Sequence, residues 1–129
     1  MLGDYAVHVV LLSRDLAESR GFYHDQLGLE ILDENEDAIT FRSGSTELAV
    51  TKSTTGTSDE QTQAGWHVDD LEAELRELRE RGVEIQEYDM PEQGLKTVDG
   101  IADIGFALMA WIIDPHRNAL AIMQLKQPA

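Results

Sequence analysis

The groups in this chain that could do chemistry are imidazoles and carboxylates, because the sequence has 4 histidines and 25 acidic residues but no cysteine. The missing thiol excludes a disulfide, a thiolate metal site and a cysteine nucleophile. The sequence also contains no G-x-S-x-G, P-loop or G-x-G-x-x-G motif, so serine hydrolase, NTPase and dinucleotide-binding functions have no support. Metal binding through histidine and carboxylate groups stays open.

Each of these side chains also has a plain structural interpretation. His8 lies between Val7 and Val9 in an apolar run, where a hydrogen-bonded core histidine is commoner than a metal ligand. Glu47 follows a turn by two residues, as a solvated residue at a strand start would, and His67 either lines a cavity or has a structural role. The other candidates are expected at the surface (His24, His116, Arg117) or in packed positions (Trp66, Trp111).

The composition predicts one acidic globular domain. The chain has 129 residues, 42% of them hydrophobic, which is enough to bury roughly two-thirds of the unfolded surface. Its net charge of −15 disfavours binding to a phosphate backbone, so nucleic acid is not an expected partner. The same charge permits a cationic ligand, although a solvated acidic surface explains it equally simply. No leader or membrane span is recognisable, and a cytoplasmic location is expected.

The first half of the chain predicts one helix among four strands. Asp15 is an expected helix N-cap with Glu18 completing a capping box, and Gly28 is the expected C-cap. The helix should turn Leu16, Phe22, Tyr23 and Leu27 towards the core. The expected strands, from their β-branched and alternating residues, are 5–12, 29–32, 38–42 and 46–51.

The second half repeats this pattern after a polar, glycine-containing linker. It predicts an amphipathic helix over 70–81, ended by Gly82, with Glu72/Arg76 and Glu77/Arg81 as i,i+4 pairs. The segment 89–105 has the glycine and proline content of a loop that rims a cavity. A turn at Asp114-Pro115 precedes the last strand. The expected strands are 64–68, 83–87, 106–113 and 119–125.

The two halves are related by an internal repeat. The stretch His8–Leu16 aligns with Gln63–Leu71 at an offset of 55 residues, and Gly28–Ile31 (GLEI) aligns with Gly82–Ile85 (GVEI) at an offset of 54. A repeated unit predicts a pseudo-symmetric fold, in which equivalent positions of the two halves can face one site.

Three motifs in their order carry a resemblance to a known family. They are Asp15-Leu16-x-x-Ser19-x-x-Phe22-Tyr23-x-x-x-Leu27-Gly28, then Val68-Asp69-Asp70-Leu71, then Asp114-Pro115-x-x-Asn118 before a strand. The whole chain resembles the vicinal oxygen chelate superfamily, which includes glyoxalase I, bleomycin-resistance proteins, fosfomycin-resistance enzymes and extradiol dioxygenases. The resemblance implies an α+β fold of two βαβββ modules, with eight strands in cupped mixed sheets and the helices outside. It also implies a homodimer and one domain over 1–129, with modules at 5–52 and 63–126 and a linker at 53–62.

The resemblance also implies where a metal would bind. Its ligand positions fall on His8, Glu47, Gln63 and Ala121. His8 and Glu47 are ordinary ligands for Zn²⁺, Ni²⁺, Fe²⁺ or Mn²⁺, whereas Gln63 offers a neutral oxygen and Ala121 offers no donor atom. In glyoxalase I the residue at the Ala121 position is both ligand and proton-transfer base, so glyoxalase activity is not expected. The dioxygenases and fosfomycin-resistance enzymes need two histidine ligands, and only one falls at a ligand position here.

Two functions are therefore compatible with the sequence. One is a bleomycin-resistance-like protein that sequesters a small organic molecule in its cup without a complete metal site, which the net charge of −15 would favour for a cation. The other is a metal-dependent lyase, isomerase or dioxygenase with a diverged site of His8, Glu47 and Gln63. Under either hypothesis six residues are candidates to line the cup: His8, Glu47, Gln63, His67, Trp111 and Ala121.

Overall fold

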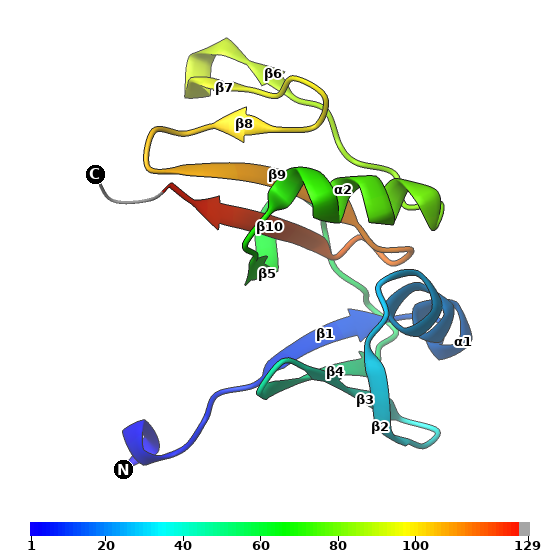
Figure 1. Cartoon of the computed structure of the whole chain (residues 1–129). Helices are drawn as coiled ribbons and strands as arrows, with labels where there is room; N and C mark the ends of the chain where they lie inside the picture. The colour runs from blue at the N-terminus through cyan, green and yellow to red at the C-terminus, as the bar shows by residue number, and fades with distance from the viewer. Residues whose placement is uncertain (127–129) are drawn as a thin grey trace. The chain divides into compact units, whose positions relative to one another are not determined.

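The computed structural model describes residues 1–126, and its contacts divide the chain into two compact units. The first unit comprises Met1–Ser58 together with the turn Asp114–Asn118. The second comprises Asp59–Ile113 and the chain from Ala119 onward. Each unit holds one four-stranded mixed sheet and one principal helix (Figure 1). The predicted α+β fold of two βαβββ-like modules is thus confirmed.

The first unit is a sheet with the strand order β1-β4-β3-β2, in which β1 is parallel to β4 and the other pairs are antiparallel. A short 3-10 turn, Leu2–Asp4, precedes it, and a π-helical turn, Gly21–Gln26, continues its helix. The main elements are β1 (Val9–Ser13), α1 (Leu16–Arg20), β2 (Glu30–Glu34), β3 (Ala38–Ser43) and β4 (Thr46–Lys52).

Local signals in the sequence fix both ends of the first helix. The Asp15 carboxylate accepts hydrogen bonds from the amides of Ala17 and Glu18, at 3.0 and 3.4 Å, as an N-cap should. The Asp15 amide donates a hydrogen bond to Ser13 Oγ at 3.1 Å. In a capping box the Glu18 side chain would accept this bond instead. The helical turns end at Gly28, whose φ of 80° suits glycine, as predicted.

One face of this sheet and the helix enclose an apolar core. Leu48 and Val50 on β4 point to this face, and Phe41 pairs with Leu48 from β3. Phe22 and Tyr23 come from the helix, with the Tyr23 ring 5.6 Å from that of Phe41 between centroids. Full burial of each such apolar side chain stabilises the fold by about 1.5–3 kcal/mol.

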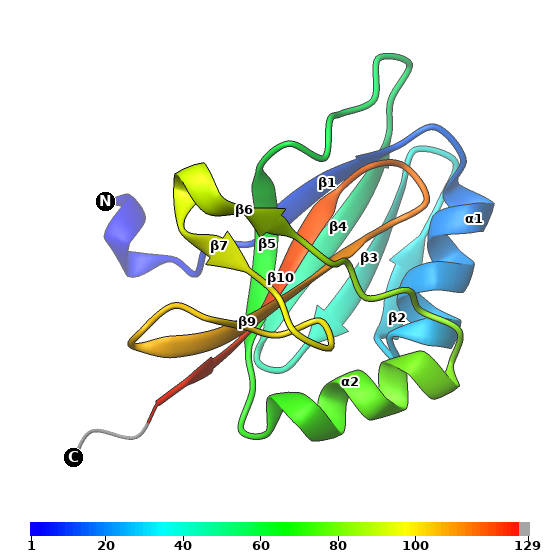
Figure 2. The ribbon, with the colours of Figure 1, turned by 90° about the horizontal axis from the view of Figure 1, so that it is seen from above.

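The second unit repeats the arrangement, with the strand order β5-β10-β9-β8 and β5 parallel to β10. Figure 2 shows the chain of this unit as it passes from the helix over 71–80 through the segment 81–101 and back into the sheet. A 3-10 turn, Pro91–Gln93, separates the strands of a small hairpin. The elements are β5 (Thr62–His67), α2 (Leu71–Glu80), β6 (Asp89–Met90), β7 (Leu95–Lys96), β8 (Ala102–Asp103), β9 (Ala107–Ile113) and β10 (Ala119–Leu125).

The helix α2 matches its prediction closely. The Asp70 carboxylate caps it by accepting from the Ala73 amide at 3.1 Å. Leu71, Leu75 and Leu78, spaced at one helical face, are all buried. The helix ends before Gly82, which has a φ of 84°. None of the helices in residues 1–126 has the length and apolar character needed to span a membrane.

Two strand predictions need correction. Residues 83–87 do not form a strand. Val83 and Ile85 are buried, but the segment is joined to β9 by one backbone hydrogen bond, from the Gln86 amide to the Trp111 carbonyl at 2.9 Å. The strand beside β9 is instead β8, from the segment expected to be irregular. The first strand begins at Val9 rather than residue 5, because its ladder with β4 starts at the Val9–Leu48 pair.

Candidate functional site

His8 and Glu47 are neighbours in the first unit. His8 immediately precedes Val9, and Glu47 immediately precedes Leu48. Because Val9 pairs with Leu48, His8 and Glu47 come side by side at the start of the parallel strands β1 and β4. Strand alternation places them on the face opposite the buried Leu48 and Val50, and both are exposed. Arg42 is the cross-strand partner of Glu47, but its guanidinium bonds to Glu30 at 3.1 Å.

Gln63 has a structural task in the second unit. The ladder between β5 and β10 shifts by one residue beside Ala119, so that Gln63 is the extra residue of a bulge. The Gln63 Oε1 atom accepts a hydrogen bond from the Ala119 amide at 3.0 Å. The oxygen that could have been a neutral metal ligand therefore already satisfies a backbone donor.

Ala121 lies in the middle of a row that crosses three strands. It pairs with Gly65 on β5 and with Trp111 on β9. The Trp111 indole Nε1 donates to Thr62 Oγ1 at 3.2 Å, although Thr62 lies on β5, beyond the intervening strand β10. The indole therefore crosses β10, where the small side chains of Ala119 and Ala121 leave room for it.

Trp111, at the end of this row, borders a hollow of about 600 Å³ that lies wholly within the second unit. Trp111 and Tyr88 line it with their rings edge to face, 5.6 Å apart and 86° between planes. The expectation that the segment 89–105 rims a cavity agrees with this hollow, whose apolar lining includes Met90, Leu95 and Ile113. Its volume falls in the range of about 300–1,000 Å³ that is typical of small-molecule sites.

The charges around this hollow are acidic. Asp59 and Glu60 line it, and within the described part of the chain no Lys, Arg or His does so. Burial, and secondarily the nearby Asp59 carboxylate, raise the pKa of Tyr88 above the usual range for a phenol. Tyr88 therefore stays protonated at neutral pH and can donate a hydrogen bond. Its neighbours Gln61, Thr62 and Gln86 add neutral polar groups.

The remaining histidines are not gathered into this hollow. His67 pairs with Met123, which places it on the same sheet face as Trp111, but it does not line the hollow. His24 is exposed, as expected, with its Nδ1 atom 2.8 Å from the Leu29 carbonyl. The expectation for His116 was wrong: its side chain is only 11% exposed, and its Nδ1 atom accepts a hydrogen bond from the Arg14 amide at 3.3 Å.

The Asp114-Pro115-x-x-Asn118 motif has a buried structural role in the first unit. Asp114 accepts from the Tyr23 hydroxyl at 2.6 Å, and from the side chain of Asn118 at 2.7 Å. Asn118 also donates to the Leu12 carbonyl at 2.8 Å. Burial, and secondarily the Asp114 carboxylate, raise the pKa of Tyr23 strongly. The motif thus joins the π-helical turn Gly21–Gln26 and β1 to this turn.

The donors that the resemblance implies for a metal are divided between the two units. Within each unit of the described chain, no three His, Asp or Glu side chains come close enough to hold an ion. The first unit contributes two donors, His8 and Glu47. The second contributes Gln63, whose oxygen is already bonded, and Ala121, which has none. Transition metals held by protein side chains typically have at least three such ligands.

Sequence reasoning missed the residues that give the hollow its character. Tyr88, Asp59 and Glu60 fell in segments expected to be irregular or to be the linker, where no pattern singled them out. The row from Gly65 through Ala121 to Trp111 depends on the bulge at Gln63, which no turn or glycine signal announced.

Comparisons with known proteins agree with this architecture. Solved structures with the same fold include a glyoxalase/bleomycin resistance protein/dioxygenase from Alicyclobacillus acidocaldarius (TM-score 0.74, 20% identity, 96% of this chain and 93% of that one). A glyoxalase family protein from Enterococcus faecalis gives a TM-score of 0.71 at 21% identity, covering 95% and 99%. An antibiotic binding protein from Streptomyces sp. CB03234 gives 0.68 at 16% identity, covering 95% and 96%.

A search of curated proteins finds no match. The family model of the glyoxalase/bleomycin resistance protein/dioxygenase superfamily, however, matches residues 6–122, nearly the whole chain. The chain belongs to this superfamily.

Proposed function

We propose that this protein binds a small organic molecule without transforming it, and that the hollow beside Trp111 and Tyr88 is its binding site. The observation that carries the proposal is this hollow: about 600 Å³, with two edge-to-face aromatic rings and two carboxylates at its border. Binding pockets for organic ligands combine such an apolar lining with a few polar groups that orient the ligand. The proposal takes the chain as one domain with modules at 5–52 and 63–126.

The expected ligand is an aromatic or amphiphilic cation. Asp59 and Glu60 supply the negative charge at the border, and Trp111 and Tyr88 supply ring faces that attract a cation by about 0.5–2 kcal/mol each. The net charge of −15 adds a long-range attraction that concentrates cations near the surface. The antibiotic binding protein from Streptomyces, which has the same fold, is consistent with a sequestering role.

The residues at the superfamily's ligand positions favour binding over catalysis. Ala121 has no group that could accept a proton, and the indole of Trp111 crosses its strand. Gln63 satisfies the Ala119 amide. Neither residue can serve as the proton-transfer base that a glyoxalase requires at its equivalent of Ala121.

The test uses Trp111 as the reporter. The chain has two tryptophans, so Trp66→Phe leaves Trp111 as the single indole, and the variant also serves as the folding control. Titration with a series of organic cations, and with neutral and anionic compounds built on the same rings, should quench the Trp111 emission only with cations. The melting temperature should rise in parallel, since a ligand that binds the folded state stabilises it.

Two further variants check that the hollow is the site. Asp59→Asn and Glu60→Gln together should weaken cation binding by at least about tenfold, which corresponds to the loss of about 1.4 kcal/mol. Asp69→Asn with Glu72→Gln removes the same charge outside the hollow and should change binding little. Equal losses in both pairs, or no preference for cations in Trp66→Phe, would refute the proposal.

A metal-dependent lyase, isomerase or dioxygenase is the second candidate, favoured by the position of His8 beside Glu47 on neighbouring strands. Metal analysis of tag-free purified protein tests it. Stoichiometric Zn²⁺, Ni²⁺, Fe²⁺ or Mn²⁺ that is lost in both His8→Ala and Glu47→Ala would support this candidate over the first. Retention of the metal in both variants would exclude the His8, Glu47 and Gln63 site.

We also propose that the protein is a homodimer and that nucleic acid is not a partner. Each sheet has edge strands whose backbone groups need covering, and a second copy is the usual solution in symmetric assemblies. The net charge opposes binding to a polyphosphate. The molar mass in solution, measured by light scattering, tests the dimer.

A further inference from the structure

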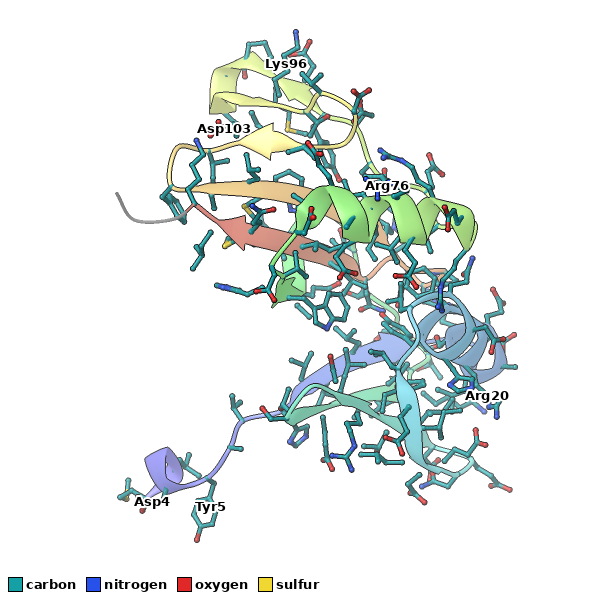
Figure 3. The ribbon with its side chains drawn as sticks, in the orientation of Figure 1. Asp4, Tyr5, Arg20, Arg76, Lys96 and Asp103 are labelled. Atoms are coloured by element: carbon teal, nitrogen blue, oxygen red, sulfur yellow. The ribbon has the colours of Figure 1, made fainter. Side chains whose placement is uncertain are left out.

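A second depression in the second unit is lined by basic side chains, although the chain as a whole is acidic. Its volume is about 1250 Å³, and its walls come from α2 and from the segment 96–108. Arg76 and Arg79 line it from α2, and Lys96 lines it from β7. Three of the chain's 10 basic residues therefore border one depression, which we call the α2 groove. Figure 3 labels Arg76 on α2, Lys96 on β7 and Asp103, a further lining residue, on β8.

The α2 groove is separate from the hollow beside Trp111. Leu108 lines the groove and Trp111 lines the hollow, and these two residues of β9 are an odd number of positions apart. Because successive side chains of a strand alternate, the two point to opposite faces of the sheet. Leu75 of α2 also lines the groove, which therefore lies on the face that this helix covers. The groove is thus a second candidate binding site, independent of the ligand in the hollow.

Arg76 and Lys96 have no partner for their charges. The sequence predicts two i,i+4 ion pairs on α2, but in the described part of the chain only Glu77 and Arg81 form theirs, at 3.1 Å. Within residues 1–126, the side chains of Arg76 and Lys96 make no ion pair and no hydrogen bond. The chain has 25 acidic residues, so a basic side chain without an acidic partner is unexpected. These two charges remain available to an anion from solution.

The carboxylates of the groove do not neutralise these two charges. Asp103 already accepts a hydrogen bond from Lys126 Nζ at 2.8 Å. Glu72, Glu80 and Asp99 are exposed, so water hydrates their charges. The net charge of −15 repels anions at a distance, but at physiological salt the charges more than about 8 Å away are largely screened. An anion that reaches the groove therefore meets the local positive charges.

Hydrogen bonds fix the wall that residues 98–101 form. Arg79 Nη2 donates to the Asp99 carbonyl at 2.9 Å, which ties this turn to the helix. Within the turn the Val98 amide donates to the Ile101 carbonyl at 2.8 Å, and the Ile101 amide donates back at 3.0 Å. Val98 nevertheless presents to the groove an apolar side chain that is 66% exposed. The groove therefore offers a preformed apolar surface together with two unpaired positive charges.

This combination indicates the chemical class of the occupant. An inorganic anion would leave the apolar surface uncovered, and an uncharged hydrophobic molecule would leave the basic groups without a partner. We propose that the α2 groove binds an organic carboxylate with an apolar body, such as a medium-chain fatty acid. The carboxylate pairs with Arg76, whose guanidinium can bind both carboxylate oxygens, and Lys96 adds a second positive charge. The apolar body lies on Leu75, Val98 and Leu108. This inference goes beyond the proposed function, because it adds a ligand of opposite charge at another site.

A titration followed by heteronuclear NMR tests the site, because each amide reports on its own surroundings. Hexanoate, octanoate and decanoate, below their micelle concentrations, should shift the amides of Lys96, Val98 and Ile101. Their affinity should rise about two- to fourfold with each added methylene, as the burial of apolar surface predicts. Octanol and acetate should bind at least about tenfold more weakly than octanoate, since each lacks one half of the recognised chemistry. Octylammonium, a ligand of the class proposed for the hollow, should leave these amides unshifted.

Substitutions of the two basic residues check which groups hold the carboxylate. Arg76→Gln and Lys96→Gln should each raise the Kd of octanoate at least about fivefold, because each removes one local charge. Lys52→Gln is the matched control, since it removes the same charge from the exposed end of β4 in the first unit. It should change the Kd less than about twofold, because a distant surface charge is screened. All three positions are exposed, so unchanged melting temperatures are expected.

The outcomes separate this inference from the proposed function. Octanoate binding that is weakened in Arg76→Gln and Lys96→Gln, but not in Lys52→Gln, supports the inference. Octanoate that shifts no groove amide, or that binds all variants equally, overturns it, whatever cations do at the hollow beside Trp111. A polyglutamate peptide that shifts these amides where no alkyl carboxylate does would also overturn it, and would assign the groove to an acidic protein segment. Octanoate binding that persists while the hollow binds no cation refutes the proposed function alone.

Discussion

The Trp111 indole donates a hydrogen bond to the Thr62 hydroxyl at 3.2 Å, across a whole intervening strand. The ring passes over β10 between Ala119 and Ala121, the partners of Thr62 and Trp111. Ala121 is the position to which the resemblance assigns the carboxylate of glyoxalase I, and here an aromatic ring crosses its strand.

Ala121→Glu should destabilise the protein rather than create a base. Ala121 is only 6% exposed, so the larger side chain must displace the indole or leave a carboxylate partly buried. Overpacking and the burial of a polar group together predict a loss of at least about 2 kcal/mol in the free energy of unfolding. Urea denaturation measures this loss, with Ala17→Glu at an exposed helical site as the control. Wild-type stability for Ala121→Glu would mean that the indole does not occupy this space.

Gln63→Ala should remove the acceptor that the Ala119 amide uses at the bulge. The expected cost is about 1 kcal/mol, the usual net value of a partly exposed hydrogen bond. Gln63→Glu keeps an oxygen acceptor and should recover most of it. Hydrogen exchange at the Ala119 amide, followed by NMR, should be faster in Gln63→Ala only. Equal exchange rates in the two variants would show that the bond does not protect this amide.

Tyr23→Phe should change the response of the protein to alkaline pH. The pKa of Tyr23 is raised in the folded state by burial and by Asp114, so the folded protein keeps the proton that the unfolded chain loses near pH 10. The associated stability is complete below pH 10 and is lost as the pH rises above it. The unfolding free energy of the wild type should therefore fall above pH 10, and that of Tyr23→Phe should fall less steeply.

The same variant also loses the 2.6 Å hydrogen bond to Asp114, at a cost of about 1–3 kcal/mol at neutral pH. Tyr5→Phe, at an exposed tyrosine, is the control for both effects and should match the wild type. Parallel curves above pH 10 for Tyr23→Phe and the wild type would contradict the assigned role of Tyr23.

Gly100→Ala should test how the segment 83–87 is held. Gly100 has a φ of 83°, and an added Cβ atom would lie 2.5 Å from Ile85 Cγ2. Gly94→Ala shares the positive φ, at 66°, but meets nothing within 4 Å, so it isolates the backbone cost of about 1 kcal/mol. Gly100→Ala should cost at least about 1 kcal/mol more in thermal or urea unfolding. Equal losses would show that Ile85 moves aside freely.

The sequence predicted those features that depend on short-range signals. Asp15 caps its helix, and Gly28 and Gly82 end theirs, because each needs only the residues of its own helix end. The segment 83–87 was mistaken for a strand because alternating burial looks the same in a strand and in an extended segment without a ladder.

The candidate site was harder to predict for a physical reason. Gln63, Ala121 and Trp111 were among the candidates, but the hydrogen bond of Gln63 and the strand pairing of Ala121 depend on a one-residue shift between β5 and β10. Tyr88 and Asp59, which border the hollow with Trp111, are far apart in the chain and lie in irregular segments. Such groupings are set by tertiary packing, which local periodicity does not record.

The turn Asp114–Asn118 belongs to the first unit although it joins two strands of the second. The repeat in the sequence therefore does not mark a position at which the chain could be divided into its two structural units. A fragment that stops at the linker would leave the Tyr23 hydroxyl and the Leu12 carbonyl without their partners. Synthesis on the ribosome must likewise reach Asn118 before the first unit can be completed. The N-terminal half therefore cannot form its hydrogen bonds to Asp114 and Asn118 until nearly the whole chain has been synthesised.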